Sequence, residues 1–378
     1  MKICAIGLRG IPDVMGGIET HCEHLYPRLA KLDDKIEIVV IGRSGYARSG
    51  RYGNVRLVNV WAPRHKALET LVHTPLAILY ARLFLHPDVI HLHAVGPGFF
   101  TPLARLLGFR VVGTHHSQDY KREKWGRFGR WFLKAGEQMM ARFANEVICV
   151  SSTIETSLGE RFPLAKQRFV TIRNGAPPAG SDKPGASVLD KFGLKPGGYI
   201  LCVGRLDPAK GFPDAVRAFQ MARPEGMKLV IAGSGLPNDD FVEELQRSAS
   251  DDILFIGAQP AESVRMLYRN TALFLHPSHL EGFAIVVLEA LAADAPILVT
   301  DIPAHAEVGL DAHSYFKCRD VEGLAARLRA GDFERLRCTR RAEILRENDW
   351  DSVASRHRDI MVRQSRGRLR AEAAVPAH

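Results

Sequence analysis

At 378 residues, the chain is longer than one ordinary domain and long enough for two, each with its own core. A hydrophobic content of 46% with 25% charged residues is typical of a folded globular protein and excludes a disordered one. The net charge of +9 is uneven: residues 1–180 carry 25 Lys and Arg against 14 Asp and Glu, a balance of +11, whereas residues 181–378 carry 26 against 28, a balance of −2.

A basic first half predicts an anionic partner, such as a phosphorylated ligand or an anionic lipid. Nucleic acid is not expected, because the sequence has no zinc-finger spacing, no aromatic RNA-binding strand and no helix-turn-helix pattern. We also expect no membrane-spanning segment, since the longest uncharged stretch, residues 89–104, has 16 residues and a span needs about 18. The opening residues are too short and too soon charged for a signal peptide and indicate a first strand.

The cysteines are scattered without any CxxC pair, which favours reduced thiols in a cytoplasmic protein over disulfides. They are Cys4, Cys22, Cys149, Cys202, Cys318 and Cys338.

Short apolar runs rich in β-branched residues alternate with helical patterns along the whole chain, which is typical of parallel strands covered by helices on both faces. The first half has such runs at residues 2–8, 36–42, 55–61, 88–94, 109–116, 145–151 and 169–175; the second half has them at 199–206, 228–235, 253–259, 272–278 and 296–301. We therefore predict an α/β protein of two doubly wound, Rossmann-like domains that face each other across a cleft.

The domain boundaries follow from composition. Residues 174–187 are rich in Pro, Gly and Ser, which is typical of a linker. The predicted domains are residues 1–178 and 188–348, followed by a helix at 349–366 and a mobile tail at 367–378. Ligands of such sheets bind at the carboxyl ends of the strands.

Two loops have the composition of phosphate-binding turns. Gly16 and Gly17 precede a helical pattern, so their backbone could approach a ligand at a helix amino end, although a plain tight turn is the alternative. Arg205 and Lys210 lie five residues apart in "GRLDPAKGF" and could bring two cations to one diphosphate. A solvated surface pair is the alternative for these two residues.

Two glutamates, Glu281 and Glu289, lie eight residues apart in "SHLEGFAIVVLEALAADAP". In a continuous helix they would be about 12 Å apart, which is wider than the roughly 5–9.5 Å between paired glycosidase carboxylates. We therefore expect them to bind different parts of one long ligand rather than to act on one bond. A helix-capping acid and a buried structural acid are the alternatives.

Four histidines, His91, His93, His115 and His116, follow or end strands of the first domain. Adjacent strand residues face opposite sides, so only one of His115 and His116 should face the cleft, and we favour His116. A zinc site made by two or three of the four is an alternative, as is a purely structural role.

Residues 121–143 combine seven Lys and Arg with interleaved aromatic residues. An apolar stripe of Trp125, Phe128, Phe132, Ala135 and Met139 beside basic flanks could lie on anionic lipid, or it could pack on the sheet. The residues predicted to contact the acceptor or the membrane are Lys121, Arg122, Lys124, Trp125, Arg127, Arg130 and Trp131.

Taken together, the glycine pair, "GRLDPAKG" and the Glu-x7-Glu motif resemble the retaining glycosyltransferases of the GT-B class, specifically glycosyltransferase family 4, which includes bacterial mannosyl- and rhamnosyltransferases. The resemblance covers nearly the whole chain. It implies that Arg205 and Lys210 bind the donor diphosphate, that Glu289 binds the ribose, and that Glu281 contacts the transferred sugar. It assigns a histidine at the "THH" position, His116 or His115, to the sugar and diphosphate.

The predicted catalytic residues are therefore His116, His115, Glu281, Arg205 and Lys210. The predicted donor site adds Gly16, Gly17, Gly233, Gly257, Gly282, Phe283, Ala284 and Glu289. No metal or other cofactor is expected, because the acidic pairs Asp33-Asp34 and Asp251-Asp252 lack DxD spacing.

Two narrower stretches, "RGIPDVMGGIET" and "KREKWGR", are similar to a subgroup associated with rhamnosyl transfer in surface-polysaccharide assembly. The chain departs from that subgroup at Met15 and Ile18, where aromatics are common, and at Ala284, where glycine is usual. The expected partners are a UDP-, GDP- or dTDP-sugar and a lipid-linked glycan acceptor, with peripheral contact at the inner face of the plasma membrane. A sugar-nucleotide epimerase on the same fold and a non-catalytic nucleotide-sugar binding protein are the alternatives.

Overall fold

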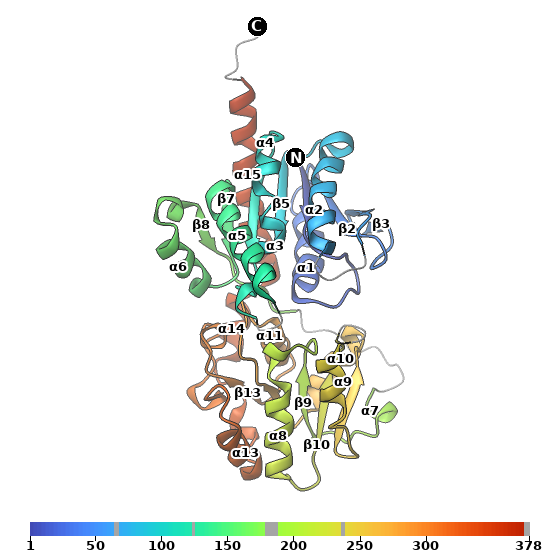
Figure 1. Cartoon of the computed structure of the whole chain (residues 1–378). Helices are drawn as coiled ribbons and strands as arrows, with labels where there is room; N and C mark the ends of the chain where they lie inside the picture. Colours follow the sequence, from blue (N-terminus) through green and yellow to red (C-terminus); the bar gives the residue numbers. More distant parts are fainter. Residues whose placement is uncertain (64–67, 123–124, 178–187, 236–238, 374–378) are drawn as a thin grey trace. The chain divides into compact units, whose positions relative to one another are not determined.

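The computed structural model describes residues 1–63, 68–122, 125–177, 188–235 and 239–373 (Figure 1). The chain divides into two compact units. Unit 1 comprises Met1–Asn174 together with the chain from Trp350 onward, and unit 2 comprises Gly175–Asp349. Most of the predicted linker, residues 178–187, lies outside the described residues. All six cysteines are free thiols.

Unit 1 contains an eight-stranded sheet in the order β3-β4-β2-β1-β5-β6-β7-β8. Its strands are β1 (Lys2–Ile6), β2 (Glu37–Arg43), β3 (Gly50–Tyr52), β4 (Val55–Val60), β5 (Val89–His93), β6 (Arg110–His115), β7 (Glu146–Cys149) and β8 (Phe169–Thr171). Neighbouring strands are parallel except β3, which pairs antiparallel with β4. The seven strands predicted for this half are confirmed, and the short edge strand β3 was missed.

Helices cover both faces of this sheet. They are α1 (Gly17–Lys31), α2 (Leu68–Tyr80), α3 (Val95–Gly98), α4 (Thr101–Leu106), α5 (Arg127–Phe143), α6 (Ser152–Arg161) and α15 (Trp350–Ala373), with the shorter turns η1 (Ala81–Leu85), η2 (Asp119–Lys121) and η3 (Pro163–Arg168). On β6, Val112 packs in the core that α1 and α15 cover, whereas a Cβ on Gly113 would meet Met140 of α5 at 2.8 Å. Successive strand residues point to opposite faces, so α5 covers the face opposite α1 and α15.

The last helix, α15, extends through residues 367–373, which the sequence had assigned to the tail. Residues 374–378 lie outside the described part of the chain. Trp350, Val353, Ala354, Ile360 and Met361 of α15 join the core of unit 1. The chain therefore enters unit 2 after Asn174 and returns to complete unit 1.

Unit 2 contains a six-stranded parallel sheet in the order β11-β10-β9-β12-β13-β14. Its strands are β9 (Tyr199–Val203), β10 (Lys228–Ala232), β11 (Ile253–Gly257), β12 (Leu273–His276), β13 (Ile297–Thr300) and β14 (Tyr315–Phe316). The five predicted strands are confirmed, and the two-residue edge strand β14 was missed.

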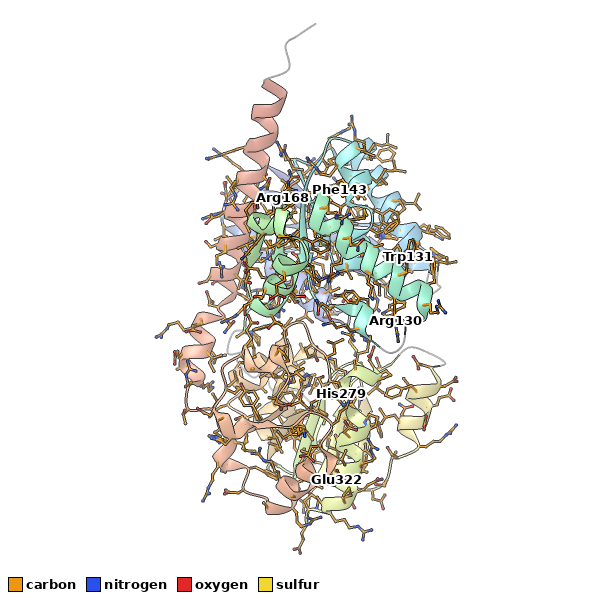
Figure 2. The ribbon with its side chains drawn as sticks, turned by 60° about the vertical axis from the view of Figure 1, so that its left-hand side comes forward. Arg130, Trp131, Phe143, Arg168, His279 and Glu322 are labelled. Atoms are coloured by element: carbon orange, nitrogen blue, oxygen red, sulfur yellow. The ribbon has the colours of Figure 1, made fainter. Side chains whose placement is uncertain are left out.

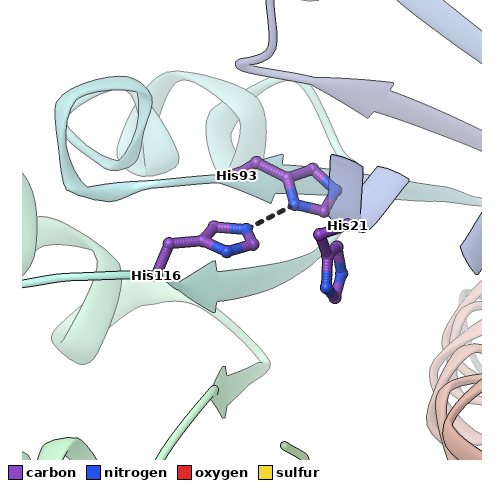
Figure 3. A group of neighbouring side chains, drawn as sticks. All are labelled: His21, His93 and His116. Atoms are coloured by element: carbon purple, nitrogen blue, oxygen red, sulfur yellow. Dashed lines mark hydrogen bonds between the residues drawn. The ribbon is translucent and has the colours of Figure 1, made fainter. Parts of the chain in front are cut away.

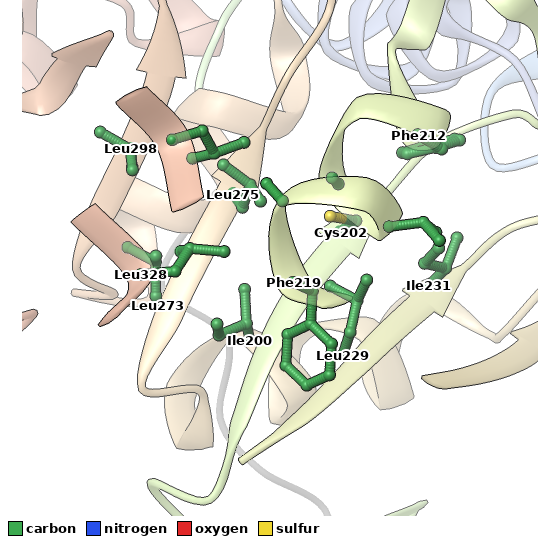
Figure 4. Close-up of a cluster of buried hydrophobic side chains, with 14 of the residues drawn as sticks. Ile200, Cys202, Phe212, Phe219, Leu229, Ile231, Leu273, Leu275, Leu298 and Leu328 are labelled. Atoms are coloured by element: carbon green, nitrogen blue, oxygen red, sulfur yellow. The ribbon is translucent and has the colours of Figure 1, made fainter. Parts of the chain in front are cut away.

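The helices of unit 2 are α7 (Val188–Lys191), α8 (Phe212–Ala222), α9 (Asp240–Gln246), α10 (Ala261–Asn270), α11 (Ile285–Ala292), α12 (Pro303–Ala306), α13 (Val321–Ala330) and α14 (Arg341–Glu347), with the turns η4 (Pro208–Lys210), η5 (Ala312–Ser314) and η6 (Glu334–Leu336). Figure 4 shows Phe219 of α8 lying over Ile200 and Leu229 of the sheet, in a cluster of fully apolar side chains. This core holds α8, and with it the loop that precedes α8, against β9.

Both sheets reverse their strand order at their first strand. In unit 1, β1 lies between β2 and β5, and in unit 2, β9 lies between β10 and β12. Loops that leave the carboxyl ends of the two strands at such a point run in opposite directions and leave a crevice where ligands bind. The relevant loops follow β1 and β5 in unit 1, and β9 and β12 in unit 2.

One helix bears on the expectation that no segment spans a membrane. Among the described residues, the helical run Leu68–Leu85 is long and apolar enough to cross a membrane by length and composition. It carries Glu69 and Arg82 and is therefore not an uncharged stretch of the sequence. In the structure one third of the run is buried, so one of its faces packs within unit 1.

Candidate functional site

The loop after β9 is fixed in unit 2 by its own turn and by a close approach to the loop after β12. Asp207 caps the turn η4 by accepting a hydrogen bond from Ala209 N at 3.1 Å. Gly211 has φ +68°, and a Cβ there would lie 2.0 Å from Pro277 O. His279 N also donates to Ala209 O at 2.8 Å. Only glycine fits at position 211. The close approach of Gly211 to Pro277 therefore holds the turn that carries Lys210 against the loop after β12.

Glu281 lies in the loop between β12 and α11 and is the centre of a hydrogen-bonded network. Its Oε1 atom accepts from Lys210 Nζ at 2.5 Å, Ser278 Oγ at 2.8 Å and His276 Nε2 at 3.0 Å. Burial raises the pKa of this carboxyl group, but the Lys210 ammonium and the His276 hydrogen bond outweigh it and hold the pKa of Glu281 well below its usual range. The carboxylate is therefore ionised and held in one position at pH 7.

Arg205 follows β9 directly and is partly buried. The backbone there is packed closely against the end of β10, because a Cβ on Gly233 would lie 1.8 Å from Gly204 O. Gly233 N in turn donates to Gly257 O at the end of β11. Gly204 and the predicted Gly233 and Gly257 therefore lie side by side at the carboxyl ends of β9, β10 and β11, and the loop carrying Arg205 and Lys210 starts from this edge.

Glu289 is the fifth residue of α11, while Glu281 precedes the helix by four residues. The interval between them is thus only partly helical, and the estimate of their separation from a continuous helix does not apply. Glu289 Oε2 accepts a hydrogen bond from Tyr268 OH at 3.1 Å. Burial raises the pKa of Glu289, in contrast to that of Glu281. The two acids therefore differ in environment, one paired with an ammonium and the other with a phenol.

The remaining predicted donor residues of unit 2, Gly282, Phe283 and Ala284, are buried and lead into α11, with Ala284 as its N-cap residue. In unit 1, Gly16 is the N-cap residue of α1 and has φ +156°. The space beside Gly17 is open, since a Cβ there would meet no atom within 4 Å. Glu19 fixes this turn by accepting a hydrogen bond from Arg9 N at 3.1 Å.

His115 and His116 point to opposite faces of the sheet. His115 is buried, and its Nε2 lies 2.9 Å from Glu137 Oε1 of α5. Glu137 also pairs with Arg161, so His115 belongs to a closed ionic network under α5. His116 is partly exposed and contacts His93 on the other face, where its Nε2 lies 2.9 Å from His93 Nδ1. Of the two, His116 is the one whose side chain a ligand could reach.

The segment predicted to contact the acceptor or the membrane differs from its expected form. Its helix begins at Arg127, and its buried face consists of Phe132, Leu133, Gly136, Glu137, Met140 and Ala141. The predicted stripe was wrong in phase, because Phe128 is 64% exposed and the buried face is shifted by one residue. Arg122 is buried and pairs with Asp119 at 2.9 Å, and Lys124 lies outside the described residues.

The exposed part of this segment consists of aromatic and basic side chains. Trp131 is 58% exposed, and its ring centroid lies 5.8 Å from that of Phe128. Figure 2 shows Arg130 and Trp131 near one end of α5 and Phe143, which is 45% exposed, near the other end. Lys121, Arg127 and Arg130 are exposed, and Trp125 is partly buried.

Sequence reasoning missed three residues that support the site in unit 2, namely His276, Ser278 and Asp214. His276 and Ser278 both bond to Glu281, and Asp214 Oδ2 lies 2.7 Å from His279 Nε2. The signal for His276 was available, because it ends the run "ALFLHPS" and strand ends at a switch point carry functional residues. Asp214 gave no such signal, since its partner is 65 residues away.

Both units match known protein families. Residues 190–330 match the family described as Glycosyl transferases group 1, and residues 15–179 match Glycosyltransferase Family 4. The chain is 26% identical to the glycogen synthase of Mycobacterium tuberculosis, in an alignment covering 100% of this chain and 98% of that protein.

Two solved structures share the fold. Sucrose-phosphate synthase from Thermosynechococcus elongatus has a TM-score of 0.79 at 19% identity, covering 96% of this chain and 98% of its own. HepE from Anabaena, solved with UDP and glucose, has a TM-score of 0.75 at 17% identity, covering 96% and 99%.

The predicted fold class is confirmed: the chain has the GT-B fold, with two parallel-sheet, Rossmann-like domains. The matched families define it as a glycosyltransferase. Within that class it is similar to glycosyltransferases of the family 4 type, with the group 1 match in unit 2 and the family 4 match mainly in unit 1.

Proposed function

We propose that the chain transfers a sugar from a nucleoside-diphosphate sugar, bound by unit 2, to a glycan acceptor, with retention of anomeric configuration and without a metal ion at the diphosphate. The observation that carries the proposal is the contact of Lys210 with Glu281 at the strand switch point of unit 2. It places a cation and an ionised carboxylate together, with Arg205 on the same loop as the cation.

This arrangement suits the chemistry of sugar transfer. As the bond to the anomeric carbon breaks, negative charge grows on the leaving diphosphate. Cations fixed beforehand stabilise that charge more in the transition state than in the ground state. Lys210 is fixed by its hydrogen bond to Glu281, and the turn capped by Asp207 fixes the backbone. Arg205 and Lys210 thus supply the positive charge that a metal ion supplies in other enzymes.

The two acids take different parts of the donor in this proposal. Glu281 is ionised and already accepts three hydrogen bonds, so it suits a sugar whose hydroxyl groups replace one or more of these donors. Glu289 Oε2 accepts a hydrogen bond from Tyr268 OH and suits the ribose hydroxyls.

The similar proteins suggest which nucleotide sugars should be tested first as donors. HepE was solved with UDP and glucose, which makes UDP-glucose a first candidate for this chain. The similarity of "RGIPDVMGGIET" to a rhamnosyltransferase subgroup adds a dTDP-sugar, and the mannosyltransferases of the same family add a GDP-sugar. Thermal-shift measurement with the three nucleotide classes identifies the base, because a ligand that binds only the folded state raises the melting temperature.

The acceptor is proposed to be lipid-linked and reached at the inner face of the plasma membrane, as in the assembly of a bacterial surface polysaccharide. Two observations support this. Phe128 and Trp131 of α5 are exposed beside the exposed Arg127 and Arg130. Aromatic and basic side chains on one helix face suit an anionic lipid surface.

The second observation is a set of exposed apolar residues on α2 and η1, which are Leu68, Leu76, Leu79, Leu83 and Phe84. Both α2 and α5 contribute to one apolar cluster around α3, through Leu71 on α2 and Phe132 and Leu133 on α5. The helices α2 and α5 therefore cover the same face of the sheet. The exposed apolar residues of α2 and η1 and the exposed aromatics of α5 lie on the outer side of these helices. We call these two sets together the α2–α5 surface.

The transfer assay tests the proposal. Arg205→Ala and Glu281→Ala should each abolish transfer from the donor that stabilises the wild type, while circular dichroism shows an unchanged fold. Full activity of either variant contradicts the site assignment. Proton NMR of the first-formed product reports retention, and donor turnover in the absence of acceptor distinguishes an epimerase from a transferase.

A further inference from the structure

Five histidines from distant parts of the sequence gather in unit 1. They are His21 on α1, His91 and His93 on β5, His116 after β6, and His357 on α15. Four of them are fully buried, and His116 is the partly exposed member. The ring centroids of His93 and His116 lie 5.2 Å apart, and those of His21 and His116 lie 4.9 Å apart (Figure 3). Such a concentration of imidazoles is more than packing alone requires, since each carries two polar atoms into the core.

Three of these rings converge. One ring nitrogen of each of His21, His93 and His116 lies within 4.8 Å of those of the other two. The closest pair is His93 Nδ1 and His116 Nε2, at 2.9 Å. Figure 3 shows the His21 ring beside this pair, from a different element. The three residues come from α1, β5 and the loop after β6, so the tertiary fold alone brings them together.

The neighbouring polar groups orient the rings as those of a metal site do. His21 Nδ1 lies 2.7 Å from Asn174 Oδ1, which can only accept, so His21 carries its proton on Nδ1. Its Nε2 atom is buried and has no hydrogen-bond partner among the residues that the structure describes. A buried nitrogen lone pair without a partner is costly, and it points to a group that binds there.

Tyr26 orients the His93 ring in the same way, through a hydrogen bond to one ring nitrogen. Its hydroxyl lies 2.5 Å from His93 Nε2 and 2.9 Å from His91 Nδ1. One hydroxyl proton serves two ring nitrogens when one imidazole donates to the oxygen and the other accepts from it. With His93 Nε2 as the donor, Tyr26 donates to His91, and His93 Nδ1 keeps its lone pair toward His116.

We propose that His21, His93 and His116 bind one divalent transition-metal ion of the zinc type, through His21 Nε2, His93 Nδ1 and His116 Nε2. Asn174 and Tyr26 then act as the outer hydrogen-bond acceptors that fix metal-binding imidazoles in known sites. Zinc–nitrogen bonds of about 2.0–2.1 Å put tetrahedral ligands about 3.3 Å apart. The separations of up to 4.8 Å therefore close by a shift of about 1.5 Å in one ring.

The chemistry of the ligands selects the metal. Imidazole nitrogens suit zinc and its neighbours, whereas calcium and magnesium require oxygen ligands. The three-nitrogen set leaves a fourth position for water or a ligand oxygen. This proposal departs from the expectation that the chain holds no metal, because His21 is 72 residues before His93 and no local spacing reveals it. It does not depend on the proposed function.

The first measurement is the metal content of the full chain, produced without a histidine tag, treated with EDTA and then dialysed against zinc. We expect about one zinc ion per chain by mass spectrometry and a higher melting temperature than that of the EDTA-treated protein. Cobalt added in place of zinc should give the visible absorption of a tetrahedral site. A chain that takes up no zinc and shows no shift contains only a hydrogen-bonded histidine pair, and that result overturns the proposal.

Variants then locate the ion. His21→Gln and His116→Gln should each lose the zinc and the rise in melting temperature. His357→Gln is the matched control, because His357 is equally buried and lies outside the three-residue group, bonding through Nδ1 to Val353 O. If His21→Gln fails to fold, the His116→Gln variant tests the assignment by itself, because His116 is partly exposed and its replacement should disturb the core less. Zinc uptake that survives His116→Gln at one ion per chain contradicts the assignment.

Discussion

Lys210 Nζ lies 2.5 Å from Glu281 Oε1, although 71 residues separate the two in the sequence. The contact follows from the strand order of unit 2, because β9 and β12 are parallel neighbours and their following loops leave the same edge of the sheet. Gly211 and Pro277 bring these loops into contact, and Ser278 and His276 hold the carboxylate from the other side. The donor site proposed for the enzyme is therefore preformed in the fold of unit 2.

Lys210→Met should destabilise the protein as well as weaken donor binding. The side chains of Lys210 and Glu281 are only 14% and 8% exposed, so removing the ammonium leaves a carboxylate in a largely dry position. Such a loss costs about 3 kcal/mol of the free energy of unfolding. Arg217→Met is the matched control, because Arg217 pairs with Asp214 but is 63% exposed and should cost less than about 1 kcal/mol. Calorimetric unfolding measures both, and equal effects would contradict this account of the pair.

The acid stability of the protein should depend on Glu281. Its pKa is lower in the folded state than the usual 4.5, so the carboxylate stabilises the fold fully above about pH 4.5 and loses that effect as the pH falls through the folded-state pKa. Glu281→Gln should therefore be less stable than the wild type at pH 7, and the difference should shrink below about pH 4.5. Melting temperatures measured from pH 7 to pH 3 check this. A difference that stays constant over the range would mean that Glu281 does not titrate as a paired group.

Gly211→Ala should be the more damaging of two matched glycine substitutions in unit 2. Gly211 and Gly226 have almost the same backbone, with φ +68° and +69°, so alanine carries a similar conformational cost of about 1 kcal/mol at each. A Cβ at Gly226 meets nothing within 4 Å, whereas one at Gly211 would lie 2.0 Å from Pro277 O. We expect Gly211→Ala to displace Lys210 and to weaken donor binding strongly. Gly226→Ala should leave donor binding unchanged, and equal affinities in both variants would contradict the role of the contact.

The strands could be predicted from the sequence because buried parallel strands are continuous apolar runs, such as residues 199–206 and 228–235. The two strands that were missed, β3 and β14, have three and two residues and lie at sheet edges, where too few residues carry a pattern. The phase of α5 was wrong for another reason. Glu137 is buried because it is hydrogen-bonded to His115 and ion-paired with Arg161, and a rule that places charged residues outside cannot foresee such partners.

The site could be predicted only in part. Loops with glycine and cations, such as the one holding Arg205 and Lys210, are visible as local motifs. The contact between two such loops is not visible, since Lys210 and Glu281 meet across 71 residues only because β9 and β12 are neighbouring strands. The same limit applies to His21, which joins His93 and His116 through the packing of α1 on the sheet.

The α2–α5 surface should bind anionic vesicles at low salt. Replacing Phe128 and Trp131 together by serine removes exposed aromatic area beside Arg127 and Arg130, so co-sedimentation with anionic liposomes should fall several-fold. Met221→Ser is the control, because Met221 is 48% exposed on α8 in unit 2 and lies outside this surface. If the wild type does not sediment with anionic vesicles, or if the control and the double variant behave alike, the peripheral membrane contact is wrong.

The central claim is that the loop between β9 and α8 binds the donor diphosphate. A crystal structure of the enzyme soaked with the nucleotide sugar that gives the largest thermal shift tests it most directly. We expect a phosphate oxygen within about 3 Å of both the Arg205 guanidinium and Lys210 Nζ, with a sugar hydroxyl on Glu281. A bound nucleotide sugar whose phosphates contact neither cation would contradict the account.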